Sequence, residues 1–249
     1  MKLRSKPSNF SLSFGLAIIC YFPLSFGASH SVKELTNCLD NFGKYSENAR
    51  RFIFSQHISN IYCQCIDGIV YLGENREGVR TGRGAMIWPD GTYYEGDFDN
   101  FKRNGYGKME WINGQRYSGM FKDDRRHGLG VMNLTSGAIY QGMWINEVRQ
   151  GFGAISYPTG FKYRGQWKND QISGWGEAIF PNGTVYSGKW EHGIQRGYGI
   201  LTSTAGELLE GDWDGEAVNG RGSYTGSDGR QIVGNWDHNT LTPFASQTK

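Results

Sequence analysis

The chain has 249 residues, with 26 lysines and arginines against 24 aspartates and glutamates, and 37 glycines against 6 prolines. Three of the basic residues, Lys2, Arg4 and Lys6, lie in a leading segment without acids, so the rest of the chain holds 23 basic and 24 acidic residues. This balance excludes a global positive field for nucleic acid, and the regular spacing of the glycines among aromatic residues excludes a flexible linker.

Residues 1–27 have the layout of a secretory signal peptide. A basic start precedes an apolar centre at 14–22, and small residues follow around Gly27 and Ala28. Pro23 leaves the apolar run shorter than the ~20 residues of a membrane-spanning helix. We therefore expect an exported protein, either secreted, periplasmic or on the cell surface; a retained membrane anchor is the alternative.

Residues 28–67 are predicted to form a helical N-terminal cap and a degenerate first strand. Ser31 and Glu34 form a capping-box pattern, and apolar residues recur at helical spacing up to Phe42. A second short helix is expected within 46–59. We expect the two helices to cover the open end of the array that follows, because terminal repeats need protection against edge pairing.

Three cysteines, Cys38, Cys63 and Cys65, remain after the predicted cleavage. In an exported protein Cys38 would bridge one of the other two and leave one free thiol. Their spacing is weak for zinc, so no metal site is predicted. Shifted by one repeat, Cys63 and Cys65 fall where Met86 and Trp88 stand, which predicts inward positions in the degenerate first strand.

Residues 68–237 form an array with a period of 23 residues, comprising seven full repeats and a partial eighth. In the cell 94–116, Tyr94, Gly96 and Phe98 alternate with acidic residues, and the stretch 105–111 alternates in the same manner. Such alternation indicates two short strands per repeat, each with one apolar face. The fold class is therefore an all-β repeat array, an elongated, twisted antiparallel β-hairpin meander with a short helical N-terminal cap.

Two kinds of turn are expected in each repeat. A polar turn at 99–104 would join the two strands of the cell, and a glycine turn at 112–114 would lead to the next cell, because glycine readily adopts a positive φ. The final segment, 238–249, is predicted to be a flexible tail.

The repeated glycines within strands have a packing role in this interpretation. Aromatic rings would lie over backbone that has no side chain, and burying a ring contributes roughly 2–3 kcal/mol, which more than offsets the cost of glycine in a strand. A Gly107→Val change should therefore clash with a ring. The structural series is Gly96, Gly119, Gly142, Gly165, Gly188 and Gly211.

The cell Y-x-G-x-[FW]-x6-G-x-G-x6-G resembles the MORN (membrane occupation and recognition nexus) repeat, and the resemblance covers the array 68–237. Departures gather at the ends, where Leu209 and Ile232 replace the leading tyrosine and Asn75 replaces the first ring. Looser terminal repeats are expected. The resemblance implies a scaffold, a dimerisation module or a membrane-associated adaptor, and the segment before the array is too short for an added catalytic domain.

The sequence contains no recognisable catalytic set. Its histidines are scattered, and the Gly-x-Gly pairs precede no helix that could present its N-terminus to a phosphate. The prediction is a non-enzymatic protein without a cofactor, a metal site or a nucleic-acid partner.

One ladder of arginines marks the first half of the array. Adjacent members would lie ~10 Å apart, and each could contribute roughly 1 kcal/mol against an acidic phospholipid surface. The alternative is that these arginines pair with Asp123, Asp124 or Glu147 in solvated turns. The members of this candidate lipid edge are Arg80, Arg103, Arg126 and Arg149.

A second ladder consists of the residues between the paired glycines. Alternation points these side chains away from the aromatic face, where they would form an exposed apolar stripe; burial by sheet twist is the alternative. Such a stripe predicts a protein partner, with homodimerisation as the simplest case. Its members are Tyr106, Leu129, Phe152, Trp175 and Tyr198.

The function predicted from the sequence is a scaffold for protein–protein interaction, with possible association with acidic membranes. The alternative is a glycan or cell-wall binding module, since tryptophan-rich hairpin repeats also stack on sugars. Solvent-accessible Trp144, Trp167 and Trp190 would favour the glycan module, whereas buried rings would favour the scaffold.

Overall fold

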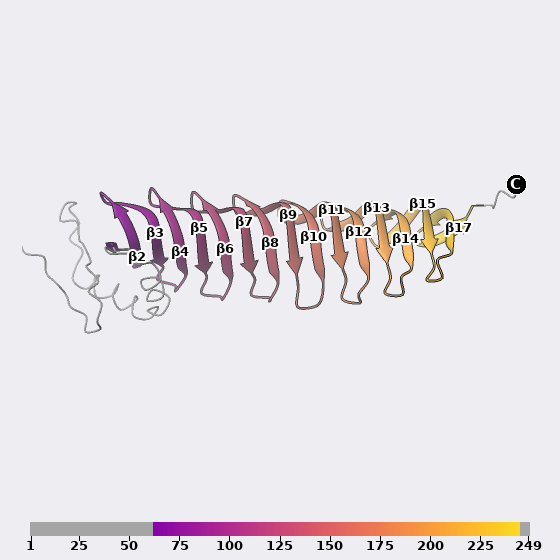
Figure 1. Ribbon diagram of the computed structural model, residues 1–249, viewed down its shortest axis with the longest axis horizontal. Coiled ribbons are helices and arrows are strands. Elements are labelled where there is room, and N and C mark those ends of the chain that lie inside the picture. The colour runs from indigo at the N-terminus through magenta and orange to yellow at the C-terminus, as the bar shows by residue number, and fades with distance from the viewer. Residues whose placement is uncertain (1–61, 245–249) are drawn as a thin grey trace, which may run out of the picture. The chain divides into compact units, whose positions relative to one another are not determined.

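The computed structural model describes residues 62–244 (Figure 1). The expected signal segment, the expected helical cap and Cys38 lie outside these residues. Within residues 62–244 all regular structure is β-strand, and no helix is present that could span a membrane. The described residues divide into two compact units, one formed by residues 62–112 with Phe121–Asp124 and the other by Asn113–Met120 with residues 125–244.

The strands of the first unit are β1 (Tyr62–Ile66), β2 (Ile69–Arg76), β3 (Val79–Ile87), β4 (Tyr93–Asp99) and β5 (Lys102–Glu110), and β6 (Arg116–Lys122) contributes residues to both units. The strands of the second unit are β7 (Arg125–Asn133), β8 (Ile139–Ile145), β9 (Val148–Ser156), β10 (Lys162–Lys168), β11 (Gln171–Ile179), β12 (Val185–Glu191), β13 (Ile194–Thr202), β14 (Leu208–Asp214), β15 (Ala217–Thr225), β16 (Gln231–Asp237) and β17 (Thr240–Pro243).

Each unit is an antiparallel meander. From β1 to β5, and again from β7 to β17, every strand pairs with the next strand in the chain (Figure 1). The predicted all-β hairpin meander is confirmed for the described residues.

The turn within each repeat is shorter than the sequence predicted. Strand β4 extends to Asp99 and β5 begins at Lys102, so only Asn100 and Phe101 form the turn. Both adopt a positive φ, 47° and 68°, as a two-residue type I′ hairpin requires. Asparagine tolerates this conformation, and the strand pairing imposes it on the phenylalanine. The turn predicted at 99–104 was therefore too long.

The core consists of interlocked aromatic rings on one face of each meander. In the second unit the Tyr140 ring is fully buried and meets Trp144 and Trp167 edge-to-face, with ring centroids 5.2 Å apart in both pairs. Its hydroxyl donates to the Met143 carbonyl at 3.1 Å. This arrangement satisfies the buried hydroxyl and uses the favourable T-shaped geometry of aromatic pairs.

Glycines provide the space for these tyrosines, as predicted. Gly142 lies opposite Gly153 in the β8–β9 pair, and a Cβ on Gly153 would lie 2.8 Å from Cε2 of Tyr140. The same geometry holds in the first unit, where a Cβ on Gly107 would lie 2.6 Å from Cζ of Tyr94. A carbon–carbon contact needs about 3.5 Å, so a side chain at either position would displace a ring.

The register of β1 differs from the prediction. Gln64 lies opposite Tyr71, in the place that a one-repeat shift assigns to Cys63. The Gln64 side chain accepts hydrogen bonds from Nε and Nη2 of buried Arg80, at 3.1 and 2.9 Å. This register gives the guanidinium a strong acceptor, which a cysteine would not supply. The inward assignment of the cysteines was therefore wrong by one residue.

The C-terminal segment continues the meander beyond the predicted end. Strand β17 pairs antiparallel with β16, with Asn235 opposite Thr242 and Trp236 opposite Leu241. The prediction of a flexible tail from residue 238 was therefore wrong for Thr240–Pro243, because β16 offers an edge whose backbone groups this segment satisfies. Residues 245–249 lie outside the described part.

Candidate functional site

The residues between the paired glycines lie at irregularities in the strand pairing. In the β8–β9 pair the register shifts between Gly142 and Trp144, and Gly151 on the bulged strand has a φ of 70°. Phe152 follows directly and lies opposite Gln166 of β10, on the face away from the tyrosine core. Bulges redirect side chains, and this bulge projects Phe152 from the sheet.

In the second unit four such side chains are largely exposed and form what we call the outer stripe. Their exposed fractions are 65% for Leu129, 67% for Phe152, 53% for Trp175 and 45% for Tyr198. In the first unit Tyr106 occupies the same place in its repeat and is also exposed. Sheet twist therefore does not bury these residues, and they form the exposed apolar stripe that favours a partner surface.

The surroundings of the outer stripe change along the second unit. Met143 lies opposite Leu129, and Met120 lies over Gly128, so this end is apolar and contains flexible side chains. Toward the other end Lys189 lies opposite Trp175, and Asp212 lies opposite Tyr198.

Tyr198 is held at the polar end of the stripe by a hydrogen bond. Its hydroxyl donates to the Glu210 carboxylate at 2.5 Å, and this bond raises the pKa of the tyrosine above its ordinary value. The phenol is therefore oriented across the face while the ring remains exposed.

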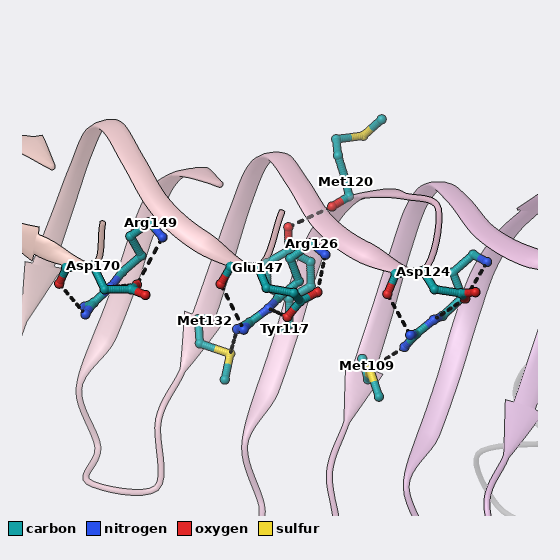
Figure 2. Close-up of polar contacts among 10 residues, drawn as sticks. Met109, Tyr117, Met120, Asp124, Arg126, Met132, Glu147, Arg149 and Asp170 are labelled. Atoms are coloured by element: carbon teal, nitrogen blue, oxygen red, sulfur yellow. Dashed lines mark hydrogen bonds and ion pairs between the residues drawn. The ribbon is translucent and has the colours of Figure 1, made fainter. Parts of the chain in front are cut away.

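The arginines of the candidate lipid edge are engaged within the protein. The backbone N–H of Arg126 and its Nε both donate to the Glu147 carboxylate, the latter at 2.7 Å, as Figure 2 shows. The guanidinium lies 4.2 Å from the centre of the Trp144 ring. Arg126 thus clamps the next hairpin turn and covers a core ring.

Arg149 repeats this arrangement one repeat later. Its backbone N–H and Nε donate to Asp170 at 3.0 and 2.9 Å (Figure 2). Its guanidinium lies 4.5 Å from the centre of the Trp167 ring. In the first unit Arg103 makes the equivalent contacts with Asp124. The side chains of these three arginines are only 16–22% exposed.

These contacts confirm the predicted pairing with Asp124 and Glu147, and Lys102 pairs with Asp123 at 3.1 Å. The arginines are less solvated than the sequence suggested, because their guanidinium groups lie over rings. Burial also lowers the pKa of Arg80, which is the most enclosed member of the ladder. The structure thus gives the ladder an intramolecular role, and lipid binding by it stays a prediction.

The tryptophans of the aromatic face are buried. Trp144, Trp167 and Trp190 are exposed to 4%, 5% and 6%, respectively. Sugar recognition by stacking requires an accessible ring face, which none of these three residues offers. The criterion set by the sequence therefore favours the scaffold over the glycan module.

Sequence analysis did not identify two features of the site. The first is the bulge that projects the stripe residues, whose signal was the Gly-x-Gly pair itself. The second is the stacking of each arginine on a core ring, as Arg126 stacks on Trp144. In residues 62–244, histidine, cysteine, aspartate and glutamate side chains form no group of three suited to a metal ion.

The fold and the site define a class: a tandem β-hairpin repeat protein with a glycine-spaced aromatic core and an exposed apolar stripe. The family model described as MORN repeat matches six consecutive segments, which together make up more than half of the chain. The chain belongs to the MORN repeat family. The matched segments are 71–93, 94–116, 117–139, 140–161, 163–185 and 186–207.

Comparison with solved structures gives more distant similarities. The TCP domain of SAS-4 from Drosophila melanogaster, in complex with a proline-rich motif of Ana2, is 13% identical; the match covers 61% of this chain and 83% of that chain, with a TM-score of 0.41. The TCP10 domain of CPAP from Danio rerio is 11% identical, with coverage of 72% and 84% and a TM-score of 0.43. At such TM-scores neither similarity supports an inference about function. No curated protein matches the chain.

Proposed function

We propose that this protein is a non-enzymatic scaffold whose outer stripe binds a protein partner, and that a second copy of the chain is that partner. The observation that carries the proposal is the exposure of Leu129, Phe152 and Trp175 on the face away from the core. Side chains of this kind dominate the energetics of protein interfaces when they become buried.

The size of the exposed apolar surface suits a dimer. The four stripe residues, with Met120 next to them and Ile139 farther along the same face, each expose on the order of 100 Å². Together they offer about 600 Å² on one copy, close to the ~800 Å² per partner of a standard interface. The polar residues around the stripe would supply the remaining rim.

The spacing of the stripe favours a second copy over an unrelated partner. Two strands per repeat separate successive stripe residues by ~10 Å, and a second copy carries the same spacing. Ridges of equal period interdigitate along their whole length, whereas a partner with another period would match at one or two residues. A two-fold axis near Phe152 and Trp175 would place the apolar end of each stripe against the polar end of the other.

Sedimentation equilibrium at 1–100 µM tests this proposal. The wild-type chain is expected to dimerise, and Phe152→Asp to weaken the dimer about 100-fold, as truncation of an interface hot spot does. Ile194→Asp is the matched control, because Ile194 is also exposed, to 49%, but lies outside the stripe. A monomeric wild type at 100 µM, or equal effects of the two substitutions, would overturn the proposal.

We also propose that the protein is exported. Cys65 is disulfide-bonded, which supports an oxidising compartment. A retained N-terminal membrane anchor is the alternative. Mass spectrometry of the N-terminus of the purified protein tests export: a chain that starts near residue 28 supports it, and an intact Met1 contradicts it.

A further inference from the structure

The outer face of β2–β4 in the first unit carries an apolar patch that is buried. We define this N-terminal outer patch as Val70, Leu72, Ala85, Ile87 and Tyr93, all exposed to 7% or less. Val70 lies opposite Ile87, which lies opposite Tyr93, and Leu72 lies opposite Ala85. By alternation these residues face away from Tyr71 and Met86, which belong to the aromatic core.

The sheet itself does not account for this burial. Three repeats later, in the second unit, Ile139 occupies the position of Val70 and is 44% exposed. Gln141 and Lys162 occupy the positions of Leu72 and Tyr93, and both are exposed. Equivalent positions are thus exposed in the second unit, even where the residue is the apolar Ile139, and buried in the first unit, so another part of the chain covers the patch.

The described residues offer no candidate for that cover. Among residues 62–244, the strands in extended contact with β2 and β3 are their neighbours within the sheet. Beyond the described part, the chain has residues 1–61 before β1 and only 245–249 after β17. Residues 245–249 contain no large apolar side chain, so the residues before β1 are the candidate cover.

The disulfide of Cys65 links the patch to the same segment. Cys65 lies opposite Val70 of the patch and is disulfide-bonded. The backbone of an extended strand separates residues two apart by about 6.7 Å, whereas a disulfide needs Cβ atoms about 3.8 Å apart. Cys63 therefore cannot be the partner, which must come from the chain before β1.

We propose that residues 28–61 fold back onto the N-terminal outer patch and are held there by a disulfide between Cys38 and Cys65. The alternative partner, Cys20, belongs to the apolar segment that resembles a signal peptide. Residues around Cys38 supply apolar side chains at helical spacing, Leu35, Leu39 and Phe42, which can cover such a patch. This inference is independent of the proposed dimer.

Peptide mapping of the full oxidised chain without reduction tests the link. Trypsin is expected to release residues 34–44, which contain Cys38, joined to residues 52–76, which contain Cys65. Fragmentation within the joined peptide would assign the bond. An unlinked 34–44 peptide, or a bond between Cys63 and Cys65, would overturn the assignment.

Limited proteolysis tests docking on the patch. Ile87→Ser removes apolar surface at a position where β9 carries Ser156, so the strand tolerates the change. Cleavage after Lys44, Arg50 and Arg51 is expected to be at least tenfold faster in Ile87→Ser and in Leu72→Glu. The matched control is Gln141→Glu, which places the same charge at the equivalent position of the second unit and should change nothing.

Unchanged cleavage in both patch variants would contradict the proposal. Cleavage of the wild type that slows with rising protein concentration would also contradict it, because the cover would then come from a second copy. Unchanged tryptophan fluorescence of Ile87→Ser would show that the array remains folded.

Discussion

The space between Tyr140 and its paired glycines predicts the cost of adding one methyl group. In Gly153→Ala the new Cβ would lie 2.8 Å from Cε2 of the Tyr140 ring and would also meet its hydroxyl oxygen. Carbon atoms need about 3.5 Å, so the ring must move by roughly 0.7 Å. That movement strains its edge-to-face contacts with Trp144 and Trp167 and its hydrogen bond to the Met143 carbonyl.

The expected loss of stability follows from these terms. Overpacking a core costs about 1–3 kcal/mol, and weakening a buried hydroxyl bond adds about 1 kcal/mol. Replacing glycine by alanine in a strand returns roughly 0.5–1 kcal/mol. We therefore expect Gly153→Ala to lower the free energy of unfolding by about 1–3.5 kcal/mol.

Urea unfolding followed by tryptophan fluorescence measures this loss, and a double-mutant cycle identifies its cause. In a Tyr140→Leu background the same Gly153→Ala change should cost less than about 1 kcal/mol, because the ring is absent. Gly206→Asn is a control at a turn where nothing lies within 4 Å of an added Cβ, and asparagine tolerates the positive φ of 85°. An equal cost of Gly153→Ala in both backgrounds would refute the clash with the ring.

Three further predictions concern the arginine ladder and the tyrosine core. Arg126→Ala should lower the free energy of unfolding in urea by about 1–2 kcal/mol, because the stack on Trp144 is lost. Arg196→Ala, which removes an exposed ion pair, should lower it by less than about 0.5 kcal/mol. Equal losses in the two variants would contradict the clamp. A triple variant should bind acidic phospholipid vesicles at low salt as the wild type does, because the replaced guanidinium groups already donate to carboxylates of the protein; it combines Arg103→Ala, Arg126→Ala and Arg149→Ala. Loss of vesicle binding in a flotation assay would support the lipid edge instead. Burial raises the pKa of Tyr140, Tyr163 and Tyr186 to about 12, above the ordinary 10.0. Between these two pH values the folded state keeps protons that the unfolded state releases, so the urea midpoint should stay constant below pH 10 and fall between pH 10 and 12. A midpoint that stays constant through pH 11.5 would contradict this prediction.

The repeat could be predicted from the sequence because each regular cell contains an aromatic ring to be packed and, at the same offsets, the glycines that leave space for it. Tyr94 needs space, and Gly96 and Gly107 provide it at fixed offsets, so a shift of one period places the rings and glycines of the regular repeats. The alternation of period two then assigns the stripe residues to the opposite face. Both inferences use local geometry, which the tertiary structure does not override.

Features that depend on pairing between strands were harder to predict from the sequence. The register of β1 is set by the bond between Gln64 and Arg80, which are 16 residues apart. The two-residue turn at Asn100 and Phe101 is imposed by the pairing of Asp99 with Lys102. The arginine clamp joins neighbouring repeats, so the sequence offered the pairing of Arg126 with Glu147 only as an alternative to lipid binding and did not indicate the stacking on Trp144.

Photo-crosslinking from within the outer stripe tests the central claim most directly. A benzoylphenylalanine at position 152 of the full chain, irradiated at tens of micromolar, should give a covalent dimer whose crosslinked peptide maps to the stripe of the partner copy. The same group at position 182, in the turn that contains Asn182 and Gly183, should give none. Equal crosslinking from the two positions, or no crosslinking from position 152, would contradict a docking surface on this face.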